Sequence, residues 1–177
     1  MSDTPTSEIS MPDTSIPDTG LMERILEFRS QPENQSPHGN FLNLTILDVS
    51  PSRSVVQIPY NAELAGNAAT GILHGGLITT ILDAASGLAV IAALSEQMAI
   101  ATLDLRIDYL KPATPGRAVT ASGHCYKVAK SVCFVRGLAY HDDPNDPIAN
   151  STATFMVTGS SGAKTTAQAT SRDGGQK

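Results

Sequence analysis

One carboxylate stands alone in the least polar stretch of this sequence. Residues 75–94 contain no Lys, Arg, Glu or Pro, and Asp83 is their only charge. No Lys or Arg lies anywhere between residues 54 and 105. An unpaired carboxylate in an apolar segment costs free energy, so stability alone would favour an apolar residue at this position. We therefore predict that Asp83 is functional, with a structural Asp bonded to Thr79 or Thr80 as the alternative.

Two glycines, Gly75 and Gly76, open the same stretch directly after His74. The first turn of a helix presents unpaired N–H groups at the positive end of its dipole, which can receive a developing oxyanion. A Gly-rich turn required by packing is the alternative. At a rise of about 1.5 Å per residue, Gly75 and Asp83 lie roughly 12 Å apart in one chain, too far to act on one carbonyl group. If two copies pack with these helices antiparallel, Gly75 of one can meet Asp83 of the other.

Thr102 and a group of basic residues are the other polar candidates. Thr102 lies on the polar face of a predicted strand with Asp104, Arg106 and Asp108, where its hydroxyl either helps Asp83 to hold a water or faces solvent. Solvated strand faces explain most of the basic residues that follow, but a few could hold the phosphates of a nucleotide-like carrier. Six of the 12 basic residues fall in this part of the chain: Arg106, Lys111, Arg117, Lys127, Lys130 and Arg136.

Other chemistries lack their residues. The two cysteines, Cys125 and Cys133, have no metal-ligand spacing and are expected to be small buried residues, with an oxidised pair across a hairpin as the alternative. No nucleophile elbow, P-loop, dinucleotide fingerprint or H-E-x-x-H motif is present, so we predict neither a metal nor a cofactor. A net charge of -5 argues against nucleic acids or anionic membranes as partners.

The elements that must position these residues follow from the apolar pattern. We expect one domain over residues 20–158 between disordered tails at 1–19 and 159–177. The predicted elements are a short helix at 21–28, strands at 41–49 and 54–60, a helix at 75–94, and strands at 101–109, 118–127, 131–141 and 147–158. Two strands, a helix and four successive strands with short connections require an antiparallel sheet. The fold class is therefore α+β, with the sheet wrapped around one long central helix in the hotdog arrangement.

The same helix is apolar enough to raise the question of a membrane span. A lone aspartate at mid-span costs about 2.5–3.5 kcal/mol on insertion scales, so a helix wrapped by a sheet is the better explanation. The polar N-terminus has no signal-peptide pattern, and we predict a cytoplasmic protein. The exposed edges of such a sheet predict pairing with a second copy of the chain.

Two motifs together resemble the PaaI-type acyl-CoA thioesterases of the hotdog superfamily. They are Asn-x3-Gly-x2-His-Gly-Gly-x6-Asp at residues 67–83 and Thr-Leu-Asp-Leu-Arg-Ile-Asp-Tyr-Leu-Lys-Pro at 102–112, and the resemblance covers residues 40–158. It implies metal-free hydrolysis of acyl-CoA by a homodimer or a dimer of dimers. In dehydratases of the same fold, a His acts with an Asp or Glu in a different sequence setting. A non-catalytic acyl-CoA-binding or regulatory hotdog module remains the alternative.

The resemblance also implies a role for each matching residue. The backbone N–H of Gly75 polarises the thioester carbonyl, Asp83 acts as general base or nucleophile, and Thr102 helps to hold the water. Asn67 and His74 orient the nucleophile and the thioester, although Asn67 lies seven residues before His74 where many relatives have six. The expected substrate-binding residues are Gly76, Arg106, Lys130 and Ser131.

Overall fold

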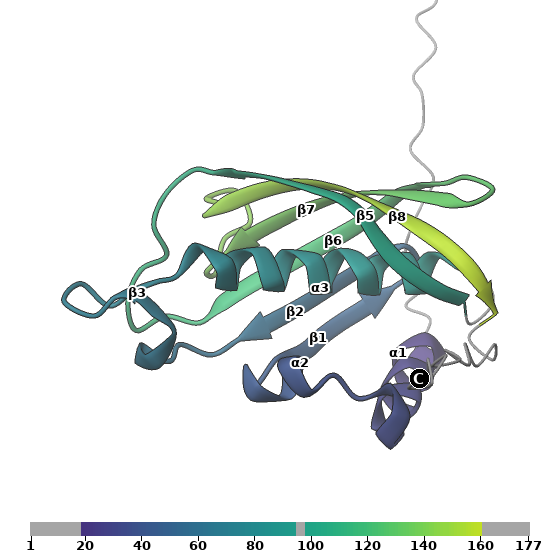
Figure 1. Ribbon diagram of the computed structural model, residues 1–177, viewed down its shortest axis with the longest axis horizontal. Coiled ribbons are helices and arrows are strands. Elements are labelled where there is room, and N and C mark those ends of the chain that lie inside the picture. The colour runs from purple at the N-terminus through teal and green to yellow at the C-terminus, as the bar shows by residue number, and fades with distance from the viewer. Residues whose placement is uncertain (1–18, 95–97, 161–177) are drawn as a thin grey trace, which may run out of the picture.

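A computed structural model describes residues 19–94 and 98–160 of the chain (Figure 1). Its main sheet is antiparallel, with the strand order β1-β2-β6-β7-β8-β5, and it curls around the long helix α3 (Gly75–Ala93). The strands of this sheet are β1 (Thr45–Ser50), β2 (Arg53–Ile58), β5 (Met98–Tyr109), β6 (Val119–Val128), β7 (Val132–Tyr140) and β8 (Ala149–Ser160). The predicted α+β hotdog arrangement, with two strands before the helix and four after it, is confirmed.

The smaller elements lie before α3. They are α1 (Thr19–Ser30), η1 (Pro32–Asn34), α2 (Pro37–Phe41), η2 (Ala62–Leu64) and a small hairpin of β3 (Ala65–Asn67) and β4 (Ile72–Leu73). The predicted N-terminal helix is present as α1, which contacts the edge strand β1. The predicted tails fall largely outside the described residues, although α1 begins at Thr19 and β8 continues to Ser160. The domain limits therefore stay a prediction.

One side of α3 packs closely against the sheet. Leu82, Ala85 and Ala89 are completely buried on this side. The Ser54 hydroxyl of β2 donates a hydrogen bond of 2.7 Å to the Ala85 carbonyl oxygen. A Cβ atom on Gly123 of β6 would lie 2.6 Å from that same oxygen, so only glycine lets β6 approach so closely. This contact fixes the rotation of the helix about its own axis.

The other side of α3 is open in the protomer. Thr80, Asp83, Ala84, Gly87 and Ile91 follow one another at helical spacing, and all are half-buried or exposed. The sheet thus encloses one side of the helix, as predicted, while the opposite side faces a cavity. By length and composition α3 could cross a membrane, alone among the described helices, but it packs against the strands as a core helix.

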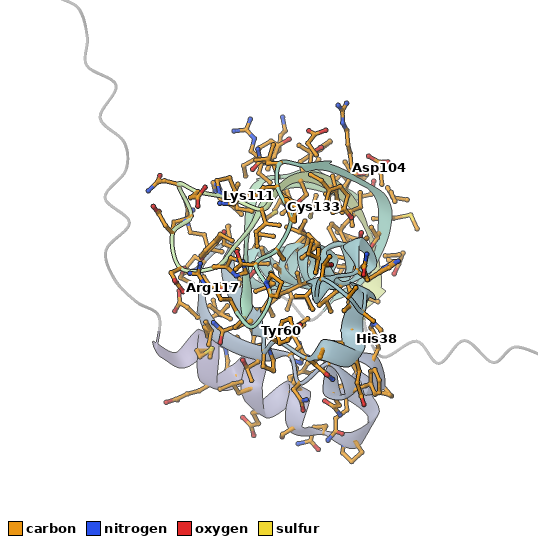
Figure 2. The ribbon with its side chains drawn as sticks, turned by 90° about the vertical axis from the view of Figure 1, so that its left-hand side faces the viewer. His38, Tyr60, Asp104, Lys111, Arg117 and Cys133 are labelled. Carbon is orange, nitrogen blue, oxygen red and sulfur yellow. The ribbon has the colours of Figure 1, made fainter. Side chains whose placement is uncertain are left out.

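A bulge in β5 corrects the predicted faces of that strand. The register with β8 shifts between Thr102 and Asp104, so Leu103 is an extra residue and its side chain is exposed. Strict alternation predicted that Thr102 would share a face with Asp104. The bulge instead turns Thr102 toward α3, while Asp104 lies at the outer rim of the sheet in Figure 2.

The segment before β1 differs from its predicted extended form. Phe41 ends helix α2 and is 72% exposed, and the strand begins only at Thr45. Ser36 caps α2 by accepting a hydrogen bond of 3.1 Å from the Gly39 N–H. Asn43 then adopts a left-handed backbone conformation, with φ of 54°, which ends the turn. Local capping therefore overrides the apolar pattern that favoured a strand.

The two cysteines are free and buried where β6 and β7 pair. Burial, and then the neighbouring Cys133, raise the pKa of the Cys125 thiol to about 11. Burial also raises the pKa of Cys133. The prediction of small buried residues is confirmed, and the alternative of an oxidised pair is not what the structure contains.

Candidate active site

Asp83 and Thr102 lie together in the lining of a cavity beside α3. The Thr102 hydroxyl of β5 donates a hydrogen bond of 2.9 Å to Oδ1 of Asp83 on α3. Both residues line a mainly apolar cavity of about 690 Å³, and Asp83 is the only acidic residue in its lining. No Lys or Arg forms an ion pair with Asp83 in the part of the chain that the structure describes. The carboxylate is thus held by a neutral donor beside an apolar space.

His74 and the two glycines build the start of α3. His74 is the N-cap, and its Nδ1 accepts a hydrogen bond of 2.9 Å from the Gly76 N–H. In the neutral ring the proton is therefore on Nε2, which is left as a donor. A Cβ atom on Gly76 would lie 2.9 Å from His74 Nδ1, so glycine is required for this cap. The Gly75 N–H has no acceptor among the described residues, which leaves it available to a ligand.

Tyr109, at the end of β5, fixes this first turn from the other side. Its hydroxyl donates a hydrogen bond of 2.9 Å to the Gly75 carbonyl oxygen and lies 2.9 Å from the Thr79 hydroxyl. Thr79 itself donates to the same carbonyl oxygen at 3.3 Å. No role is predicted for Tyr109 from the sequence. Its place in the alternating pattern of the strand, on the same face as Leu105 and Ile107, was the one available signal.

One protomer does not bring all the predicted site residues together. Gly75 and His74 do not line the cavity that holds Asp83. The Asn67 side chain closes its own turn, because its Oδ1 accepts a hydrogen bond of 2.9 Å from the Ala69 N–H. No hydrogen bond joins Asn67 to His74 or Asp83 within the described ranges. The motif residues therefore form two separate groups in the single chain.

The predicted substrate-binding residues also lie away from the cavity. Arg106 is exposed and pairs with Asp108 at 3.5 Å on the outer face of the sheet. Lys130 and Ser131 are exposed in the connection between β6 and β7. Gly76 is exposed at the start of α3. Contacts of these four residues with substrate stay a prediction.

The wall of the cavity opposite α3 was not predicted. It consists of one face of α1, whose residues recur at helical spacing, together with α2. His38 of α2, to which sequence reasoning gave no function, is part of this wall. The sequence marks the apolar face of α1 but contains no signal that it would be placed opposite Asp83. The α1 residues in the wall are Leu21, Arg24, Ile25, Phe28 and Arg29.

Solved structures share this architecture. A crystal structure of a Pseudomonas aeruginosa protein matches with a TM-score of 0.66 and 38% identity, over 77% of this chain and 98% of that one. The Escherichia coli PaaI protein of the phenylacetic acid degradation operon shares the fold, with a TM-score of 0.68 and 17% identity, over 79% of this chain and 97% of that one. These matches identify the curled sheet around one central helix as the hotdog fold.

Sequence comparisons identify the family. The model of the thioesterase superfamily matches residues 70–148. The medium/long-chain acyl-CoA thioesterase YigI of Salmonella typhimurium is 32% identical, over 59% of this chain and 76% of its own length. A Halobacterium salinarum protein named as an esterase is 40% identical, over 43% of this chain but only 54% of its own length. The chain belongs to the thioesterase superfamily, a family of thioester hydrolases, and has the hotdog fold.

Proposed function

We propose that the protein hydrolyses acyl-CoA thioesters to the free acid and CoA, with Asp83 as the catalytic carboxylate. The observation that carries this proposal is the hydrogen bond from Thr102 to Asp83 at the edge of an apolar cavity. Thr102 engages one carboxylate oxygen and leaves the other directed to a water or a substrate. The names of the YigI relatives favour medium- or long-chain acyl groups.

A homodimer supplies the group that the protomer lacks. The open side of α3 and the free edge of β5 are continuous, so a second chain can pair with β5 and place its helix antiparallel to α3. The two-fold axis then passes near Thr79, midway between Gly75 and Asp83. The Gly75 N–H of each chain faces Asp83 of the other, giving two composite sites per dimer. Two such dimers form the homotetramer that the family resemblance implies.

The chemistry requires a base, an oxyanion donor and a leaving group. Asp83 accepts a proton from water as the water oxygen attacks the thioester carbonyl carbon, and the resulting oxyanion accepts a hydrogen bond from the Gly75 N–H across the interface. The C–S bond then breaks, and the CoA thiolate takes up the proton from Asp83. In the alternative, an Asp83 oxygen attacks the carbonyl carbon itself, the C–S bond breaks and CoA leaves as the thiolate. Water then hydrolyses the mixed anhydride to the free acid and the Asp83 carboxylate, and the proton released protonates the CoA thiolate. His74 orients the thioester through its Nε2–H.

The remaining predicted residues contact the carrier in this proposal. Lys130, Ser131 and Arg106 are exposed, as groups that bind the CoA nucleotide must be, and Gly76 lies beside the oxyanion donor. Asn67 helps to orient the nucleophile of the neighbouring subunit. The mechanism uses neither a metal nor a cofactor, and the cytoplasmic location stays a prediction.

Thiol release from a panel of acyl-CoAs tests the proposed function. Asp83→Asn keeps the size and the hydrogen bond from Thr102 but removes the charge, so kcat should fall by about 100-fold or more. Asp104→Asn, a matched change on the outer rim of the sheet, should leave kcat unchanged. Binding of acyl-CoA by the wild type without any turnover would instead support the non-catalytic module.

A further inference from the structure

We propose that the groove between α1 and α3 is the subsite for an unbranched acyl chain, and that Gly87 sets the chain length that enters it. This inference rests on the proposed function, because it takes the cavity at Asp83 as the place where a thioester reacts. It adds the direction of the chain, its length and the residues that select it.

Two helix faces form the sides of the groove. On α3, the lining runs from Thr80 and Asp83 through Gly87 to Ile91, one helical turn after another. On α1, Ile25 and Phe28 belong to the facing stripe. The lining is mainly apolar, and Asp83 is its only acidic residue, as suits a substrate with an apolar chain whose thioester reacts at a carboxylate.

Gly87 determines the width of the groove one turn beyond the carboxylate. A Cβ atom at this position would lie 3.6 Å from Cε1 of Phe155 and 3.7 Å from Cδ1 of Ile100. Alanine therefore fits in ordinary van der Waals contact, but any longer side chain must project into the space between α3 and these two residues. The missing side chain keeps the path open from Asp83 to the far end of the helix.

The length of this path gives the class of substrate. From Asp83 to Leu94, the last lining residue of this segment, the helix rises about 16 Å. With C–C bonds of about 1.5 Å, an extended chain advances roughly 1.3 Å per carbon, so the groove accepts roughly a dozen carbons. Gly87 lies about 6 Å along the helix from Asp83, which is the reach of four or five carbons.

The groove stays open in the proposed dimer. If Gly75 of one chain faces Asp83 of the other, the partner helix begins opposite Asp83. Residues 84–93 of each α3 then lie beyond the start of the partner helix and are not covered by it. The partner helix therefore covers the N-terminal half of the open side of α3. The C-terminal half faces α1 of its own chain.

Binding of non-hydrolysable 2-oxoalkyl thioethers of CoA tests the subsite without relying on turnover. Each buried methylene group contributes a factor of about four in affinity. For the wild type, calorimetry should show the affinity rising by about this factor per added carbon and levelling off near twelve carbons. An affinity that does not depend on chain length would contradict the subsite.

Substitutions on the two walls locate the chain. The affinity for the dodecyl analogue divided by the affinity for the butyl analogue gives a ratio that reports on chain length. Gly87→Leu should lower this ratio at least tenfold, because the new side chain fills the path. Phe28→Ala should lower the same ratio by about tenfold through lost contact. Leu26→Ala truncates an apolar residue of the same helix that is 45% exposed and does not line the cavity, so it should leave the ratio unchanged.

The outcomes separate this inference from the proposed function. If acyl-CoAs are hydrolysed but the ratio is the same in the wild type, Gly87→Leu and Phe28→Ala, the inference is wrong and the function stands. If the analogues bind with the expected dependence on length but no acyl-CoA is hydrolysed, the proposed function is wrong and the subsite stands. If Gly87→Leu does not give the circular dichroism spectrum of a folded protein, Gly87→Ala, which fits without strain, takes its place. This variant should show a smaller drop in the ratio of dodecyl to butyl affinity.

Discussion

The two sides of α3 belong to one apolar stretch of the sequence but differ in packing. The side that faces the sheet is closed: Leu82 and Ala85 have no exposed surface, and β6 approaches so closely that Gly123 has no room for a methyl group. The opposite side holds Asp83 and Gly87 beside a cavity of about 690 Å³. The comparison shows that one face of the helix stabilises the fold while the other leaves space for a ligand.

Truncating one side chain on each side of α3 should give the largest difference, measured as the free energy of unfolding. Leu82→Ala leaves a cavity in the closed side and should lower the free energy of unfolding by about 2–5 kcal/mol. Ile91→Ala on the open side, where the side chain is already 37% exposed, should cost less than about 1 kcal/mol. Denaturant unfolding of both variants measures the difference. Equal losses would mean that the open side is as well packed as the closed one.

The donor to Asp83 gives the next largest effect. Thr102→Val keeps the shape of the side chain but removes a hydrogen bond to a carboxylate, worth about 1.5–3 kcal/mol, so kcat should fall at least tenfold. Thr102→Ser restores the hydroxyl and should recover most of the activity. Steady-state thiol release at saturating acyl-CoA measures both. Full activity of Thr102→Val would remove Thr102 from the site.

Two glycines allow a sharper comparison of stability. Gly123→Ala must move β6 or α3 and should lower the free energy of unfolding by about 1–3 kcal/mol. Gly87→Ala places its methyl group in ordinary van der Waals contact with Phe155 and Ile100 and removes a helix glycine, so it should raise the same free energy by up to about 1 kcal/mol. Thermal unfolding of the two variants should therefore shift in opposite directions. A shift of the same sign in both would contradict the packing described above.

The smallest effect is expected at the start of the helix. Tyr109→Phe removes the hydroxyl that fixes the Gly75 carbonyl, a contact worth about 0.5–1.5 kcal/mol. If the hydroxyl positions the oxyanion donor, kcat should fall about threefold to tenfold while KM changes little. A change in KM alone would assign Tyr109 to substrate binding instead.

The sequence predicts the order of the elements and the lone acid because both follow from local patterns. The helix with Asp83 is recognisable from composition, and the strands after it from alternation and turns. The position of Thr102 could not be predicted correctly in this way, because a single bulged residue, Leu103, reverses the faces of the strand. A pattern of period two contains no information on where such an extra residue lies.

The cavity wall could not be predicted for a different reason. Ile25 and Phe28 are ordinary apolar residues of a short helix, and only the path of the chain through α2 brings them opposite α3. The role of Tyr109 depends likewise on the contact between the end of β5 and the start of α3. Contacts between distant segments are therefore harder to predict from this sequence than the chemical groups themselves.

Mixing two inactive variants tests the shared site most directly. Asp83→Asn lacks the carboxylate, and Gly75→Pro lacks the N–H that serves as oxyanion donor. Pro is tolerated at Gly75 because this is the first position of the helix, and because His74 before it is already extended, with φ of −62° and ψ of 136°. Refolded together in equal amounts, half of the dimers should be mixed, each with one intact composite site, restoring about a quarter of the wild-type activity. A mixture no more active than either variant alone would contradict a site shared between subunits.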